Sequence, residues 1–161
     1  MSAPVAAADQ RPPRFAGDER ETLCALWQYH RESLVRKVSG ISDDDADRRL
    51  VGSETTLRWL VWHLADAERL WVVGRFAGRE DDSRPAAGTA RDAIAVYEQT
   101  WSVVDEVVAG ASLDDLARVP VHGDTGPVNL RWIVTHLLEE TARHAGHADI
   151  LRELIDGSTG R

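Results

Sequence analysis

The stretch LRWIVTHLLEETARHAGHADILR, from Leu130 to Arg152, decides the fold of this 161-residue chain. Apolar residues return every three or four positions from Leu130 to Leu154, which predicts one long amphipathic helix with a buried stripe. Gly157 is the residue at which we expect that helix to end. The same helix carries four side chains that bind metals or exchange protons: His136, Glu140, His144 and His147.

His144 is the member of this set that we expect to face the interior, because the apolar stripe brackets it on both sides. A buried imidazole needs a polar partner. At about 100° per residue, Glu140 lies about 40° from His144 around the helix axis, and His147 about 60° from it. One metal ion can therefore contact two of these groups. The periodicity alone leaves His136, Glu140 and His147 open as the companion of His144.

His63 lies in a second apolar helix, TLRWLVWHLADAERLWVVGRFAG, which we expect Ser53 to open and which runs to about Gly78. Helix bundles build metal sites from a pair of ligands on one helix and a further ligand from a facing helix. His63 with Glu140 and His144 fits that arrangement, and three nitrogen and oxygen ligands leave the open position that is typical of a catalytic zinc-type centre. The alternative is that His63 is a hydrogen-bonded core residue.

Two octets in these helices are nearly the same. LRWLVWHL (57–64) and LRWIVTHL (130–137) differ at only two positions, which predicts two related helix pairs that pack with approximate twofold symmetry. On this correspondence His136 is the counterpart of His63. Its two candidate roles are an inward-facing site residue and a core histidine that bonds to a neighbouring helix.

Two further helices are expected, one over residues 19–38 and one that follows Thr89 and runs to about Val108. Thr89 with Asp92 three residues later is a plausible capping box. Short helical turns are expected in the acidic segment 42–50 and at 112–116. No strand alternation of useful length appears.

These elements predict an all-α four-helix bundle with short extra helical turns in its connections. We expect residues 1–18 to form a flexible tail and residues 19–161 to form the bundle. A hydrophobic content of 43% suits one globular domain of this length.

Charge and cysteine content limit the partners. The net charge is −8 and no basic patch is concentrated anywhere, which argues against nucleic acid as a partner. Charged residues interrupt the tryptophan-rich helix, so we expect no membrane span. The single cysteine, Cys24, excludes an intrachain disulfide and fits a reducing compartment, so we expect a cytoplasmic protein. We expect Cys24 itself to be a small core residue.

Three segments carry a resemblance to a known family: YHRESLVRKVSGIS (29–42), LRWLVWHLADAERLW (57–71) and EETARHAGHADILRELIDG (139–157). Together they resemble the DinB-like superfamily of metal-binding four-helix bundles, so that a DinB/YfiT-like fold is expected. Within it the chain is most similar to an actinobacterial branch related to the mycothiol-dependent maleylpyruvate isomerases. The resemblance covers nearly the whole chain after about Asp18.

The resemblance implies a ligand set. Many members hold the ion with three histidines, one from the second helix and two from the fourth, and in the maleylpyruvate isomerase type a glutamate replaces the middle one. Carried over, the ligands are His63, Glu140 and His144. His147 stands where other relatives have glutamine, which leaves open whether it is a fourth ligand, a hydrogen-bond partner of a ligand, or a substrate contact.

The function that the resemblance implies is that of a divalent-metal enzyme, with zinc or nickel as the expected ion. Because the chain offers no well-placed thiol, thiolate chemistry requires a small-molecule thiol from outside. The resemblance implies a low-molecular-weight thiol of the mycothiol type, transferred to a small electrophile or used in an isomerisation. Glu139 or His147 is a candidate for moving protons beside the ion, with a surface charge as the other role of Glu139. The alternatives are a metal-dependent hydrolase and a non-catalytic metal-binding or stress-related protein. A homodimer is compatible with the exposed tryptophans.

Overall fold

The computed structural model describes residues 10–80, 88–120 and 126–160. The helices in chain order are α1 (Glu19–Val38), α2 (Asp43–Ala46), α3 (Leu57–Glu68), the π-helix η1 (Arg69–Phe76), α4 (Ala90–Ala109) and α5 (Leu130–Asp156). The described ranges contain no strand beyond an isolated bridge between Leu116 and Asn129. The predicted all-α class is confirmed.

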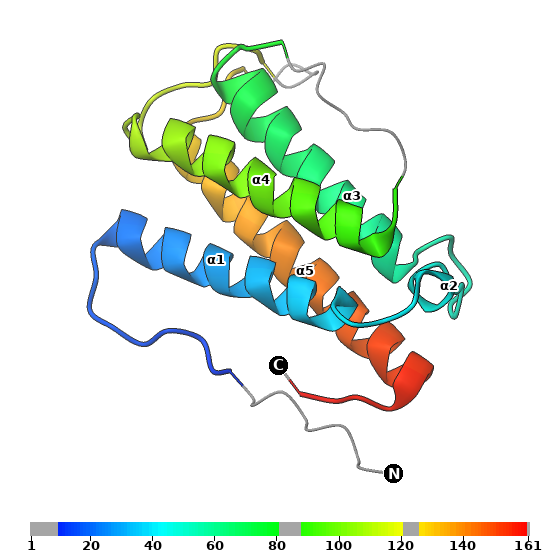
Figure 1. Cartoon of the computed structure of the whole chain (residues 1–161). Coiled ribbons are helices and arrows are strands. Elements are labelled where there is room, and N and C mark those ends of the chain that lie inside the picture. Colours follow the sequence, from blue (N-terminus) through cyan, green and yellow to red (C-terminus); the bar gives the residue numbers. More distant parts are fainter. Residues whose placement is uncertain (1–9, 81–87, 121–125, 161) are drawn as a thin grey trace.

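Four long helical rods make up the bundle. α1 packs along α5, α4 packs along α3, and α3 also contacts α5 (Figure 1). η1 directly continues α3, so these two elements form one rod. The extra helical turns predicted in the connections are α2 and a turn in which the Asp115 N–H donates to the Ser112 carbonyl.

Each long rod begins at a residue whose side chain accepts a backbone N–H of the first turn, which satisfies a donor that the helix itself leaves unpaired. These capping residues are Asp18, Thr56, Thr89 and Asn129. The predicted capping box of Thr89 and Asp92 is confirmed. The prediction that Ser53 opens the second helix is wrong, because the Thr56 side chain accepts from the Trp59 N–H and the Ser53 hydroxyl bonds to Thr55 instead.

The predicted end of α5 at Gly157 is confirmed, whereas the predicted burial of Leu154 is wrong. Gly157 follows the helix with a φ of 76°, a left-handed conformation that glycine adopts without strain. Leu154, which the pattern placed on the buried stripe, is 54% exposed. The buried side of the helix instead continues from Leu151 to Ile155, which is partly buried against the hydrophobic cluster around Leu34, so Leu154 lies off that face.

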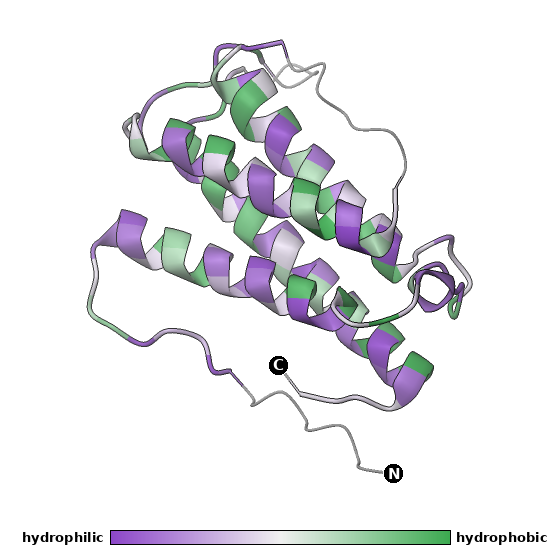
Figure 2. Cartoon of the chain, viewed as in Figure 1, coloured by the Kyte–Doolittle hydropathy of each residue, from purple (hydrophilic) through white to green (hydrophobic). Residues whose placement is uncertain are grey.

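The interior contains two hydrophobic clusters, one around Trp27 and Leu137 and one around Leu34 and Leu60. Hydrophobic and hydrophilic positions alternate along every rod, as expected for helices with one buried face (Figure 2). No helix within the described ranges is long and apolar enough to cross a membrane.

A polar layer lies between the two clusters. Arg31 bonds Glu68 through two nitrogens, at 2.9 and 2.6 Å, and both side chains are almost completely buried. The Tyr97 hydroxyl donates to the same carboxylate, and Asp105 accepts a further bond from Arg31. Arg31 falls between Trp27 and Leu34 along α1, and Glu68 falls between Ala65 and Val72 along the next rod, so each lies between members of the two clusters. Glu68 is also the last residue of α3 before the π-helix begins.

Candidate metal centre

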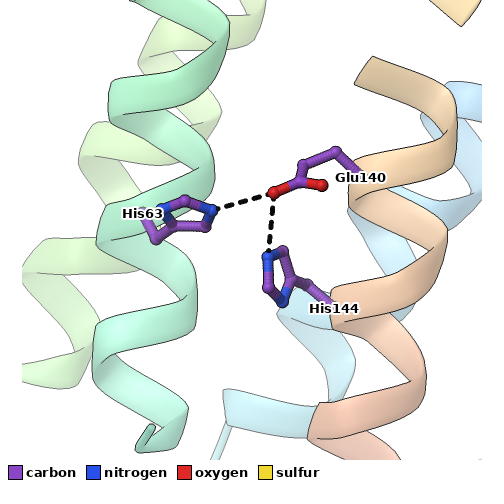
Figure 3. A group of neighbouring side chains, drawn as sticks. All are labelled: His63, Glu140 and His144. Carbon is purple, nitrogen blue, oxygen red and sulfur yellow. Dashed lines mark hydrogen bonds and ion pairs between the residues drawn. The ribbon is translucent and has the colours of Figure 1, made fainter. Parts of the chain in front are cut away.

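His63, Glu140 and His144 meet between α3 and α5 (Figure 3). Oε1 of Glu140 lies 3.2 Å from Nε2 of His63 and 3.2 Å from Nε2 of His144. One potential ligand atom from each residue lies within 4.8 Å of the others. The structure thus brings together the three residues that the resemblance implied, although they come from helices far apart in the chain.

Local structure explains why these side chains converge. Glu140 and His144 are four residues apart on α5 and therefore lie on one face of that helix. His63 lies across from them on α3 and is held by Trp59, one helical turn earlier, whose ring stacks on it with centroids 4.7 Å apart and an angle of 6° between the planes. Since Thr56 caps the turn that carries Trp59, the position of His63 is set by the start of its helix.

The electrostatics of the group favour an anionic Glu140 beside a neutral His144. Burial alone would raise the pKa of Glu140, but the hydrogen bond from His63 and the nearby His144 outweigh it, so its pKa is lowered. Burial and the neighbouring His63 lower the pKa of His144. A carboxylate and neutral imidazoles are the forms that bind a divalent cation.

The chemistry of the donor set fits a divalent metal ion, and so do the two separations between Glu140 and the histidines. In a tetrahedral site with bonds of 2.0–2.2 Å, neighbouring ligand atoms are about 3.3 Å apart. The two nitrogen–oxygen separations of 3.2 Å match that value. Three residues would hold the ion and leave one position open.

His147 contacts the opposite edge of His144. The Nδ1 atoms of the two rings are 3.2 Å apart, whereas His144 faces Glu140 with its Nε2. The two nitrogens of an imidazole point away from each other, so an ion held by His144 Nε2 would lie on the far side of that ring from His147. The geometry therefore favours His147 as the hydrogen-bond partner of a ligand, and its role as a fourth ligand stays a prediction.

The remaining candidates lie outside the group. His136 stacks on Trp132 and meets the edge of Trp71, with centroid separations of 5.0 Å in both pairs. Glu139 pairs with Arg143 on the exposed face of α5. Cys24 is partly buried on α1, and burial raises the pKa of its thiol, which agrees with the expected core role.

The aromatic surroundings of His136 repeat those of His63. Trp59 stacks on His63 as Trp132 stacks on His136. In each octet the backbone N–H of the tryptophan donates to the side chain of the residue that precedes the helix. The candidate ligands are not repeated, because Ala67 and Trp71 stand at the positions that correspond to Glu140 and His144. The approximate twofold relation therefore holds for the aromatic contacts but not for the metal-binding groups.

The sequence interpretation missed Trp59 as a contact of the centre. Its signal was present in the spacing of four residues between tryptophan and histidine, which recurs in both octets. Arg143 also borders the group, with its Nη1 3.6 Å from Oε2 of Glu140.

The bundle that brings the histidine–glutamate group together between α3 and α5 has the fold of solved DinB-like structures. A DinB-like protein from Bacillus cereus has a similar structure, with a TM-score of 0.66 and 17% identity over 83% of this chain and 91% of that one. A conserved protein from Enterococcus faecalis is similar with a TM-score of 0.63 and 14% identity over 88% of this chain and 99% of that one. The chain belongs to the mycothiol-S-transferase family, whose model matches residues 22–157. No curated protein matches the sequence.

Proposed function

We propose that the protein is a divalent-metal-dependent S-transferase that joins a thiol of the mycothiol type to a small electrophile. One observation carries the proposal: three metal-binding side chains converge at a site that contains no thiol of the chain's own. The single cysteine, Cys24, lies on α1 and is not among them. Membership of the mycothiol-S-transferase family supplies the class of the external thiol.

The proposed reaction requires the metal centre to activate a bound thiol. A divalent ion with an open position lowers the pKa of a bound thiol and so supplies thiolate near pH 7. In the transfer, the thiol sulfur forms a bond to the electrophilic carbon, the leaving group departs with the bonding electron pair, and the thiol proton passes to solvent. His63, Glu140 and His144 would hold the ion, while His147 fixes the ring of His144 through its Nδ1.

Metal analysis of purified variants tests the ligand set. We expect His144→Ala and Glu140→Gln to lose the bound ion with little loss of helicity measured by circular dichroism. His136→Ala is the matched control, because His136 lies on the same helix one turn before Glu140, packs against Trp71 and Trp132, and is not a member of the candidate group. Retention of the ion by His144→Ala would contradict the assignment. The same analysis identifies the metal, for which zinc or nickel stays our prediction.

Activity measurements separate the candidate functions. Consumption of an electrophile only when metal and mycothiol are both present supports the transferase. Turnover with metal alone would indicate a hydrolase that uses bound water, and metal binding without turnover would indicate a non-catalytic protein.

The cytoplasmic location and the homodimer also stay predictions. Trp59 and Trp132 are 44% and 45% exposed, which leaves apolar surface for a partner subunit. Sedimentation of the purified protein tests the dimer.

A further inference from the structure

Three aromatic rings pack together beside the candidate metal centre, between η1 and α5. Trp132 stacks on His136 with centroids 5.0 Å apart, and Trp71 lies 5.3 Å from Trp132 and 5.0 Å from His136. We call these three residues the aromatic group. Trp132 is 45% exposed, and the other two are partly buried. The rings therefore fix one another's orientation while keeping surface that a ligand can reach.

The aromatic group and the centre lie between the same two rods. His63 meets Glu140 from α3, and one rod further along, Trp71 meets His136 from η1. His136 lies four residues before Glu140, so the two side chains lie on one face of α5. One helical turn rises about 5.4 Å, so the aromatic group begins about one turn along α5 from Glu140. A single extended molecule can therefore contact both.

A small residue separates the two sites on the other rod. Ala67 lies four residues after His63 and four before Trp71, and its side chain is a single methyl group. It is partly buried against the cluster that includes Leu137. A molecule that extends from the centre to the aromatic group therefore meets no bulky side chain at this position.

Charged groups border the aromatic group along α5. Glu139 and Arg143 continue the spacing of Trp132 and His136 at intervals of three and four residues, so the four side chains follow one stripe of the helix. Glu139 and Arg143 form an exposed ion pair at 2.7 Å. Carboxylate and guanidinium groups bond to hydroxyls, whereas an indole ring packs against C–H groups. This combination suits a polyhydroxylated ring, which has a face of C–H groups and hydroxyls at its edge, better than a wholly apolar molecule, which needs enclosing walls.

The π-helix is a second observation that points to a binding role. π-helical turns are rare and occur frequently at functional sites. η1 carries Trp71, and Arg75 from the same element lies with its guanidinium 5.5 Å from the centroid of that ring. Nη1 of Arg75 donates to the Pro120 carbonyl at 2.8 Å, which fixes the guanidinium in turn. The backbone therefore departs from the α-helix in the segment that supplies one wall of the aromatic group.

We propose that the aromatic group binds the linked sugar and cyclitol rings of the mycothiol-type thiol. In this thiol a cysteine derivative carries the sulfur, and an amide bond joins it to the sugar ring. An extended cysteine with its amide bond spans about 6 Å, which matches the distance of about one turn between Glu140 and His136. The rings then lie against Trp132 and His136, with their hydroxyls in water or bonded to Glu139 and Arg143. The assignment rests on the proposed function, since it takes the sulfur to be held at the centre.

Binding of the rings can be measured without any reaction. We would titrate the ¹⁵N-labelled full chain, as purified, with S-methylmycothiol, whose sulfur has no proton to lose, and follow the indole N–H signals. The expected result is a saturable shift for Trp71 and Trp132, with none for Trp27 and Trp101, which contact Arg31 instead. N-acetyl-S-methylcysteine, which lacks both rings, should shift none of these four signals.

Two outcomes of this titration would overturn the proposal. One is a set of shifts confined to Trp59, which lies on the other side of His63 from the aromatic group. The other is the absence of any saturable shift, which is the result expected if a second copy of the chain covers Trp132.

A matched pair of substitutions locates the binding site. Trp132→Leu should weaken binding of S-methylmycothiol by about tenfold. Trp59→Leu removes a ring of nearly the same exposure that also stacks on a histidine, and it should leave this binding unchanged. Circular dichroism checks that both variants keep their helicity. Unchanged binding in Trp132→Leu would contradict the assignment.

Kinetics with 1-chloro-2,4-dinitrobenzene then separate this proposal from the proposed function. In that reaction the thiol sulfur bonds to the ring carbon, chloride leaves with the bonding pair, and the thiol proton passes to the buffer. We expect the wild-type protein to favour mycothiol over N-acetylcysteine in kcat/KM, and Trp132→Leu to lose most of that preference. Absence of turnover in the wild-type protein would count against the transferase, and the titration would still decide the ring site. Turnover without that preference, or with the preference retained in Trp132→Leu, would overturn the ring assignment alone.

Discussion

The imidazole of His63 lies edge-on to the imidazole of His144, with ring centroids 4.8 Å apart and an angle of 84° between the planes. His136 meets Trp71 in nearly the same way, at 5.0 Å and 70°. The offset in sequence that relates His63 to His136 also relates Trp71 to His144. The bundle thus contains two equivalent ring arrangements, and only one of them has metal-binding groups.

This equivalence predicts that a second centre can be built. Ala67→Glu combined with Trp71→His places a carboxylate and an imidazole opposite His136, in the positions that correspond to Glu140 and His144. We expect the double variant to bind two ions per chain, measured by metal analysis after gel filtration. The single variant Ala67→Glu is the control and should bind one. Binding of only one ion by the double variant would contradict the prediction. It would indicate that the π-helical geometry of η1 places residue 71 differently from residue 144.

Trp59 is predicted to support metal binding without contacting the ion. Its ring fixes the orientation of His63, and loss of a group that orients a ligand lowers metal affinity by about tenfold or more. We expect that loss in Trp59→Leu, measured by competition with a chelator. Trp132→Leu is the matched control, because it removes the equivalent ring from His136 at a residue of the same exposure. Equal affinities in the two variants would refute the role of Trp59.

The buried pair of Arg31 and Glu68 is predicted to be important for stability. Removal of one partner leaves a buried charge uncompensated, which costs about 3–5 kcal/mol in comparable pairs. We expect Arg31→Met to lower the free energy of unfolding in urea by such an amount, and Arg31→Met with Glu68→Leu to recover part of it. Arg143→Gln removes an exposed pair with Glu139 and should cost less than about 1 kcal/mol. A similar small loss in Arg31→Met would contradict the prediction.

His144 is predicted to make the metal-free protein less stable in mild acid. Because burial and His63 lower its pKa, the unfolded chain takes up a proton at this residue at a higher pH than the folded protein does. The free energy of unfolding should therefore fall as the pH drops through the ordinary histidine pKa of about 6.5. We expect a weaker dependence in His144→Gln, measured by urea unfolding at several pH values across that window. Identical slopes for the two proteins would rule out this linkage.

Hydrophobic periodicity was sufficient to predict the long helices and the inward direction of His144. It could not predict that His63 faces Glu140, because periodicity contains no information on contacts between distant segments, and that pairing came from the resemblance. The pattern also gives no sign that Arg31 and Glu68 are buried together, since nothing local shows that each is the partner of the other. The π-helix was missed for a related reason: no proline or glycine marks the point at Arg69 where it begins.

The polar layer has a consequence for motion within the bundle. Glu68 lies five residues after His63 on the same rod, and its carboxylate is bonded by Arg31 and Tyr97 from two other helices. If that rod slid along its axis by one turn, the carboxylate would enter hydrocarbon and lose those bonds, which carries a large desolvation penalty. We therefore expect axial sliding to be suppressed, so that thermal fluctuation at His63 consists mainly of small rotations that keep its ring within reach of Glu140.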